Sequence, residues 1–143
     1  MKAISIYKLA LIIFLFSLPV QAQIAPSGNT KPQARAHKNE KLYMDGSCAG
    51  HYAYGIGQLK MRVEQFGTNA QSIFMKHSPN ISKIENTVNQ CKAGKTDIDT
   101  FNSCINKLSD DDYSLYLGFW GGFTRAKNKP NELTLDTGAI CNP

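Results

Sequence analysis

The sequence predicts an all-α fold: a small four-helix domain with two disulfides and a short non-helical C-terminal tail. Apolar residues recur at spacings of three and four in four separate stretches, which is the period of an amphipathic helix. Residues that begin or end helices separate these stretches. The chain has 143 residues and four cysteines, a combination typical of small exported domains that disulfides stabilise.

Residues 1–22 have the three parts of a secretory signal peptide. Lysines supply the positive charge, residues 9–18 are apolar, and Val20-Gln21-Ala22 fits the small-residue cleavage rule. The apolar run is shorter than the roughly 20 residues that a transmembrane helix needs, although an uncleaved membrane anchor is the alternative. We therefore expect cleavage near Ala22-Gln23, a location in the periplasm or outside the cell, and no transmembrane segment in the mature chain.

Residues 23–41 predict a flexible basic linker. They are rich in proline, asparagine, alanine and lysine and lack large apolar side chains other than one isoleucine, so they bury too little surface to offset the entropy of ordering. Residues 42–143 are then the disulfide-stapled helical domain. Because this part has as many acidic as basic residues, it lacks the basic patch of a nucleic-acid-binding protein, and we expect no nucleic-acid partner.

The first stretch predicts a helix over residues 46–66. Asp45 or Ser47 can accept the first backbone N–H bonds, and Gly67 suits the left-handed position after the helix end. Its apolar stripe consists of Cys48, Tyr52, Ile56, Leu59, Val63 and Phe66.

Two shorter helices are predicted next. One begins at Ser78-Pro79, since proline is favoured at the first helical position, and Gly94 ends it. The other begins after Asp97, which can cap its start. Their apolar stripes consist of Ile81, Ile84, Val88 and Cys91, and of Ile98, Phe101, Cys104, Ile105 and Leu108.

A fourth helix is predicted over residues 110–127. Ser109 and Asp112 have the spacing of a capping box, and a run of aspartates stands where the helix dipole favours negative charge. A metal site at these aspartates is the alternative. The helix is apolar on nearly all sides, so we expect it at the centre of the fold.

Glycines indicate how the fourth helix packs. Gly118 and Gly122 form a GxxxG pattern with Gly121 beside it, although each glycine in a helix costs up to about 1 kcal/mol relative to alanine. Close approach of another backbone explains this choice. The first helix carries Gly50 and Gly55 among tyrosines, so we expect these two helices to interlock.

The cysteines predict two disulfides rather than a zinc site, because no two of them have the close spacing of metal ligands. Free catalytic thiols are an alternative. Four cysteines allow three pairings, and the expected helix ends favour Cys48–Cys91 with Cys104–Cys141, while a hairpin bridge from Cys91 to Cys104 stays open. Cys141 would then pin residues 131–143, the tail that loses the helical period.

No catalytic, phosphate-binding or metal-binding motif is present, so we expect no cofactor, no metal and no enzymatic activity. His51 is the one candidate for acid–base chemistry or ligand binding, because Tyr52 and Tyr54 flank it. The alternative is an ordinary histidine at the edge of a helix.

These observations favour an exported, non-enzymatic protein-binding domain, such as an inhibitor, an immunity factor or an envelope accessory protein. We expect its partner to be another exported or envelope protein. Tyr43, Tyr54 and Tyr113 flank the apolar stripes and are the predicted contact residues, together with His51. One alternative is a small periplasmic chaperone, since the helical plan with an early and a late cysteine resembles that of periplasmic acid-stress chaperones. The other is a small-molecule-binding or enzymatic domain centred on His51.

Overall fold

The computed structural model describes residues 35–142, with the backbone alone at residues 134–136. Within these residues the chain forms five α-helices and no strand, which confirms the all-α prediction. The predicted signal peptide (1–22) and the first part of the predicted linker lie outside the described residues.

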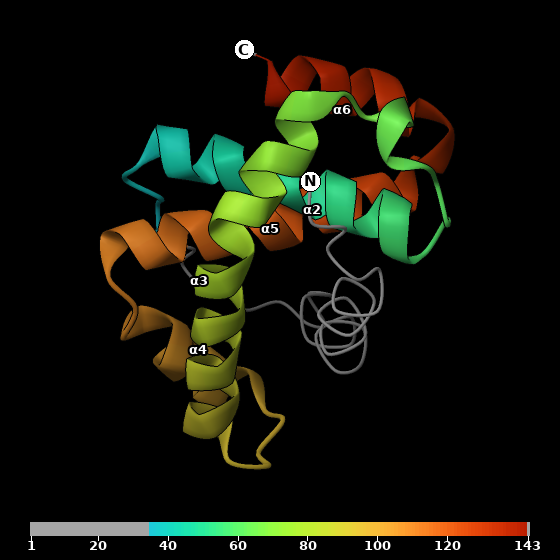
Figure 1. Ribbon diagram of the computed structural model, residues 1–143. Coiled ribbons are helices and arrows are strands. Elements are labelled where there is room, and N and C mark those ends of the chain that lie inside the picture. Colours follow the sequence, from blue (N-terminus) through green and yellow to red (C-terminus); the bar gives the residue numbers. More distant parts are fainter. Residues whose placement is uncertain (1–34, 143) are drawn as a thin grey trace.

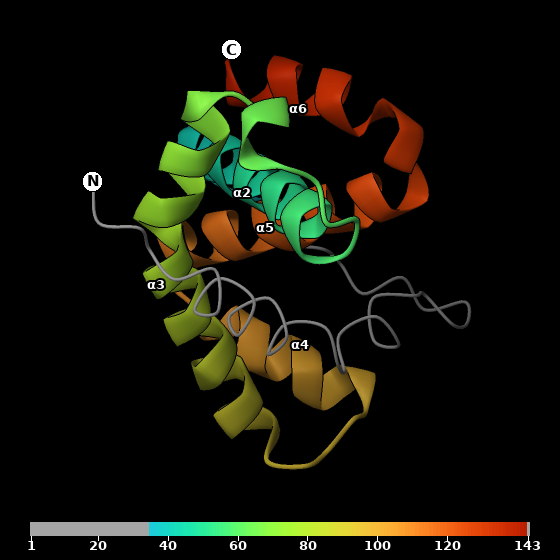
Figure 2. The same ribbon diagram turned by 45° about the vertical axis from the view of Figure 1, so that its right-hand side comes forward.

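Helices α2 (Glu40–Gly57) and α5 (Asp110–Asn128) form the centre of the fold. They lie side by side in both views, α2 from cyan to green and α5 in orange (Figures 1 and 2). Gly118 meets the backbone of Tyr43 and Gly122 meets that of Ser47, so the two helices run parallel. Helix α5 is buried on most sides, as its apolar sequence predicted.

Four glycines allow the backbones of α2 and α5 to touch. They are Gly46, Gly50, Gly118 and Gly122. A Cβ atom on Gly50 would lie 2.7 Å from the backbone nitrogen of Phe123, and one on Gly122 would lie 2.8 Å from the Cα of Ser47. Such distances leave no room for a side chain. The predicted interlocking of the first and fourth helices, with a backbone against Gly118 and Gly122, is confirmed.

The first helix has different ends from those predicted. Helix α2 begins six residues before position 46 because Asn39 caps it, with the Asn39 side chain accepting from the backbone N–H of Leu42 at 3.1 Å. It also ends earlier, at Gly57, and a short 3-10 helix, η2 (Val63–Gln65), follows a turn. The turn brings Phe66 back onto α2, where its ring meets that of Tyr52 at 5.3 Å between centroids. The helix therefore ends before the turn that returns Phe66 to its surface.

Helix α3 (Thr68–Lys92) is longer than predicted. It begins ten residues before Ser78, and Pro79 lies inside it rather than at its start. Ala70 and Phe74 are both buried and continue the apolar period upstream of the proline. Their packing keeps the helix intact even though proline removes one backbone hydrogen bond.

Helix α4 (Ile98–Asn106) lies beside the C-terminal half of α3 (Figure 1). Asp97 caps it as predicted, accepting from the backbone N–H of Thr100 at 2.8 Å. The predicted cap of α5 is present too, with Ser109 accepting from the backbone N–H of Asp112 at 3.1 Å.

The C-terminal tail was predicted to be non-helical, and this was wrong. A 3-10 helix, η3 (Pro130–Glu132), leads into helix α6 (Leu133–Cys141), drawn in red across one end of the molecule (Figure 1). Leu133 and Thr137 are almost fully buried, so tertiary packing holds this short helix. Its sequence has too few large apolar residues to show a helical period.

The two predicted disulfides are present, but the favoured pairing was wrong. Cys48 pairs with Cys141 and joins α2 to α6, and Cys91 pairs with Cys104 and joins α3 to α4. The two cysteines stand at different distances from the turn, and residues 93–97 form the loop between α3 and α4 that still lets them meet. Their Cα atoms are 5.6 Å apart. Two disulfides are more typical of exported proteins than of cytosolic ones.

The end of the predicted linker belongs to the folded part. Arg35 donates from Nη1 to the backbone oxygen of Leu108 at 2.8 Å and pairs through Nη2 with Asp110 at 2.5 Å. In return, the Tyr113 hydroxyl donates to the backbone oxygen of Arg35 at 2.6 Å. In the part assigned to the linker by composition, Arg35, Lys38 and Asn39 therefore contact the start of α5, and Glu40 and Lys41 begin α2.

Loss of Arg35 should raise the pKa of Asp110. Hydrogen bonds from Arg35 and then from Lys38 hold the pKa of this carboxyl below its usual range. A depressed folded-state pKa stabilises the fold above the unfolded-state value of about 3.9, and this contribution is lost as the pH falls through the folded-state pKa. We expect Arg35→Gln to return the pKa of Asp110 toward its ordinary value in an NMR titration of the carboxyl carbons.

Asp97 provides the internal control for this titration. Hydrogen bonds from its helix cap at Thr100 lower its pKa, and Arg35 plays no part in them. The Asp97 pKa should therefore stay low in Arg35→Gln. An unchanged Asp110 pKa, or equal shifts at the two carboxyls, would contradict the anchoring of Arg35 to α5.

Candidate binding surfaces

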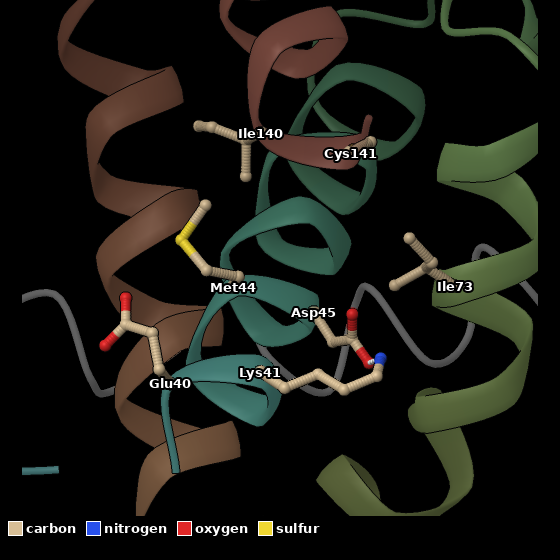
Figure 3. Close-up of a pocket in the computed structure, with 7 residues that line it drawn as sticks. All are labelled: Glu40, Lys41, Met44, Asp45, Ile73, Ile140 and Cys141. Atoms are coloured by element: carbon tan, nitrogen blue, oxygen red, sulfur yellow. Dashed lines mark hydrogen bonds and ion pairs between the residues drawn. The ribbon is translucent and has the colours of Figure 1, made fainter. Parts of the chain in front are cut away.

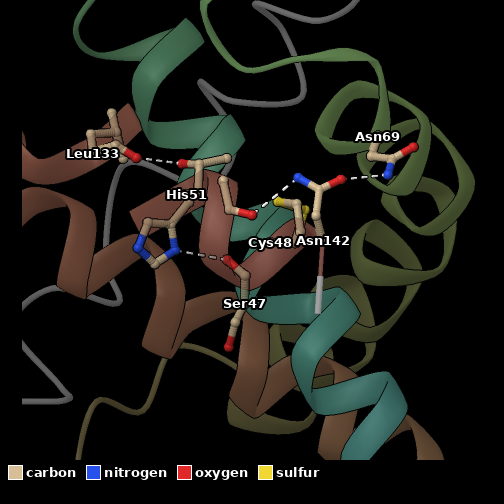
Figure 4. Close-up of a disulfide and its surroundings, with 9 residues drawn as sticks. Ser47, Cys48, His51, Asn69, Leu133 and Asn142 are labelled. Atoms are coloured by element: carbon tan, nitrogen blue, oxygen red, sulfur yellow. Dashed lines mark hydrogen bonds between the residues drawn. A yellow bond between two sulfur atoms is a disulfide. The ribbon is translucent and has the colours of Figure 1, made fainter. Parts of the chain in front are cut away.

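His51 is fully buried on α2. Its Nδ1–H donates to the backbone oxygen of Ser47 at 2.9 Å, one turn earlier on the same helix (Figure 4). The hydroxyl of Ser47 in turn donates to the backbone oxygen of Gly118 on α5 at 3.3 Å. His51 is therefore part of the packed core in this structure, and its binding role stays a prediction.

The three predicted contact tyrosines lie in different environments. Tyr113 is buried rather than exposed, with the Arg35 guanidinium 4.8 Å from the centre of its ring. Tyr43 and Tyr54 are half-buried along α2. Tyr43 stacks on His37 with 4.0 Å between ring centroids, and Tyr54 meets Phe123 edge-on. The contact roles of all three tyrosines stay predictions.

A cleft of about 390 Å³ lies between α2, α3 and α6 (Figure 3). Its lining residues are Glu40, Lys41, Met44, Asp45, Ile73, Ile140 and Cys141. Met44 and Ile140 face it from one side and Ile73 from the other, while the charged side chains stand at one end. The cleft therefore combines aliphatic sides with a charged rim.

Asp45 organises that rim. Its Oδ2 atom accepts from Lys41 Nζ at 3.1 Å and from His77 Nε2 at 2.9 Å, which ties α2 to α3. The side chains of Asp45 and His77 are only 13% and 10% exposed, so this contact is shielded from water. Asp45 was expected only as a possible helix cap, and no local spacing in the sequence pointed to a partner 32 positions away.

The far side of the cleft depends on α6. The Cys48–Cys141 disulfide fixes the last residue of this helix to α2, and Asn142 accepts from the side chain of Asn69 on α3 at 2.6 Å (Figure 4). Asn142 also donates to the backbone oxygen of Gly138 at 3.0 Å. Ile140 is thereby held in place against the cleft.

A second polar group, Glu85 with Tyr116, is enclosed between α3 and α5. The Tyr116 hydroxyl donates to Glu85 at 2.7 Å, and both side chains are buried. Burial first, and then the negative charge of Glu85, raise the pKa of Tyr116 well above its ordinary value. This hydrogen bond therefore joins α3 to α5 inside the fold.

The chain matches no protein-family model, no curated protein and no solved structure. Between residues 35 and 142, no helix has both the length and the apolar character needed to cross a membrane. Over the same residues, no group of three or more histidine, cysteine or acidic side chains is placed to hold a metal ion.

Proposed function

We propose that this protein is a non-enzymatic domain, exported to the periplasm or beyond the cell, that binds another exported or envelope protein through the cleft between α2, α3 and α6. The observation that carries the proposal is the composition of the cleft, in which Met44, Ile73 and Ile140 surround a space with charged residues at its rim. A buried aliphatic contact inside a polar rim is the usual arrangement of a protein-binding hot spot.

Charge at the rim indicates which partner surface fits. Lys41 pairs with Asp45 inside the chain, and the exposed acidic group at the rim is Glu40, whose side chain is 74% exposed and accepts from His37 Nε2 at 2.8 Å. A partner that inserts an aliphatic side chain and places a lysine or arginine beside it would satisfy both features of the cleft.

The scaffold suits binding without rearrangement. The disulfide to α6, the contact of His77 with Asp45 and the backbone packing of α2 on α5 hold three sides of the cleft in place. A preformed site loses little conformational entropy when a partner binds. These properties are those expected of an inhibitor, an immunity factor or an envelope accessory protein.

Ile73→Arg should abolish binding, because it places a charge where the partner's aliphatic side chain must lie. The tagged protein and its variants would be used to capture partners from the envelope fraction of the host under non-reducing conditions. We expect the wild type to retain one stoichiometric protein and Ile73→Arg to lose it.

Ile98→Arg is the matched control. Ile98 is an exposed isoleucine on α4 and does not line the cleft, so the same substitution there should leave capture intact. Thermal unfolding of both variants checks that each is folded. Equal capture by Ile73→Arg and the wild type would contradict the proposal, and retention of many unrelated proteins would favour the chaperone alternative.

A further inference from the structure

The cleft between α2, α3 and α6 contains a thioether. Met44 and Ile140 face it from one side and Ile73 from the other, so the sulfur of Met44 belongs to its apolar surface (Figure 3). Met44 is half-buried, and the cleft gives small solutes a way to its side chain. Of these three side chains only Met44 reacts readily with oxidants, because a thioether is oxidised far more easily than a hydrocarbon chain.

Two other methionines of the described residues have a different environment. Met61, in the turn before η2, and Met75, on α3, both pack against the buried core. Neither of them lines the cleft. Because oxidation depends on how readily the oxidant reaches the sulfur, Met44 should react before Met61 and Met75.

A peroxide converts methionine to methionine sulfoxide by transferring one oxygen atom. The sulfur lone pair attacks the peroxide, the O–O bond breaks, an S–O bond forms, and hydrogen peroxide leaves as water. The sulfur is thereby oxidised and the peroxide reduced. The apolar side chain of Met44 becomes polar and gains an oxygen atom that accepts hydrogen bonds.

Helix α2 places a hydrogen-bond donor for this oxygen beside Met44. Lys41 lies three residues earlier on the same face of the helix and also lines the cleft. An ammonium group has three N–H donors, and the contact with Asp45 at 3.1 Å uses one of them. Lys41 can therefore donate to the sulfoxide oxygen as well. The oxidised side chain would then turn toward the charged rim, at the end of the cleft away from Ile140 (Figure 3).

We propose that Met44 is a reversible oxidation site that switches the cleft from an aliphatic to a polar form. In the oxidised form Met44 no longer adds to the aliphatic surface of Ile73 and Ile140, so a partner that inserts an aliphatic side chain loses affinity. Methionine sulfoxide reductases restore the thioether with two thiols as the reductant, which form a disulfide as water leaves. The effect on the partner rests on the proposed function, whereas the modification of Met44 does not.

Treatment of the purified protein with dilute hydrogen peroxide tests the oxidation site. Peptide mass spectrometry over time should show the mass of one added oxygen atom at Met44 before it appears at the two methionines that pack against the core. In methyl NMR spectra, oxidation should shift the signals of Ile73 and Ile140, which line the cleft with Met44, and leave that of Ile98 on α4 in place. Oxidation of Met44 no faster than that of the other two, or unchanged Ile73 and Ile140 signals, would overturn the proposal.

Variants at two methionines connect the oxidation to binding. Met44→Leu keeps the size and aliphatic character of the side chain but resists peroxide, so treatment should leave its capture of the partner unchanged. Capture by the oxidised wild type should fall by about tenfold or more, because a polar group then stands in an aliphatic contact, and the reductases should restore it. Met75→Leu is the matched control and should stay as sensitive to peroxide as the wild type.

The same experiments distinguish this inference from the proposed function. Absence of capture by the untreated wild type would contradict the proposed function alone, and the order of oxidation with the methyl shifts would then decide the role of Met44. Equal capture before and after oxidation of Met44 would overturn the switch, as would the same loss of capture in peroxide-treated Met44→Leu. Thermal unfolding of the oxidised protein checks that it stays folded.

Discussion

Gly122→Ala should destabilise the protein by about 3 kcal/mol or more. The added methyl group would stand 2.8 Å from the Cα of Ser47 and would overlap its backbone oxygen, so a flexible side chain cannot relieve the contact. The two central helices would have to separate, and the aromatic side chains packed beside them would lose contacts. Chemical denaturation followed by far-UV circular dichroism measures this change.

Gly121→Ala is the matched control in the neighbouring position. Its methyl group would meet only the Tyr43 hydroxyl, so helix propensity should leave stability unchanged or raise it by up to about 1 kcal/mol. Similar stability of Gly122→Ala and Gly121→Ala would contradict the direct backbone contact of α2 with α5.

Removal of the Cys48–Cys141 disulfide should cost more stability than any other single change considered. The two cysteines are 93 positions apart, and the chain-entropy model assigns about 4.7 kcal/mol to a loop of this length. The double substitution Cys48→Ala with Cys141→Ala would also release the end of α6, and with it Ile140 at the cleft. We expect lower stability in denaturant and weaker capture of the partner.

The second disulfide provides the comparison. Cys91 and Cys104 are 13 positions apart, for which the same model gives about 3 kcal/mol. Because this disulfide joins α3 to α4, away from the cleft, Cys91→Ala with Cys104→Ala should keep partner binding once the protein is folded. A larger loss of stability from this pair than from the first, or loss of binding, would contradict the assigned roles.

Local interactions explain why much of the fold could be predicted. The caps at Asp97 and Ser109 bond backbone groups three residues away, so their spacing is visible in the sequence. The glycine pattern of Gly118 and Gly122 indicated a close helix contact for a similar reason, since little else accounts for glycines inside a helix. The parallel direction of that contact is a property of the whole fold and has no local signal.

Other features depend on tertiary packing and could not be predicted. In a sequence, Pro79 indicates the start of a helix. In the structure α3 continues on both sides of it, because residues before and after the proline are buried and packed. Helix α6 forms because Leu133 and Thr137 pack into the fold and Cys141 is tied to α2, although its sequence has no apolar stripe.

The cleft was missed for the same reason. Ile140 and Cys141 reach it only because the tail is a helix, and the contact of Asp45 with His77 joins positions far apart in the chain. The aromatic pattern led instead to Tyr113, which the anchor at Arg35 covers. Aromatic residues beside an apolar stripe fill a core as readily as they form a surface.

The most direct test of the proposed function is site-specific photo-cross-linking in the living host, with a photoreactive amino acid at position 73 in the cleft or at position 98 on α4. The cleft account predicts one cross-linked product of defined mass from position 73 and none from position 98. No product from position 73, or the same products from both positions, would show that the cleft is not where this protein meets its partner.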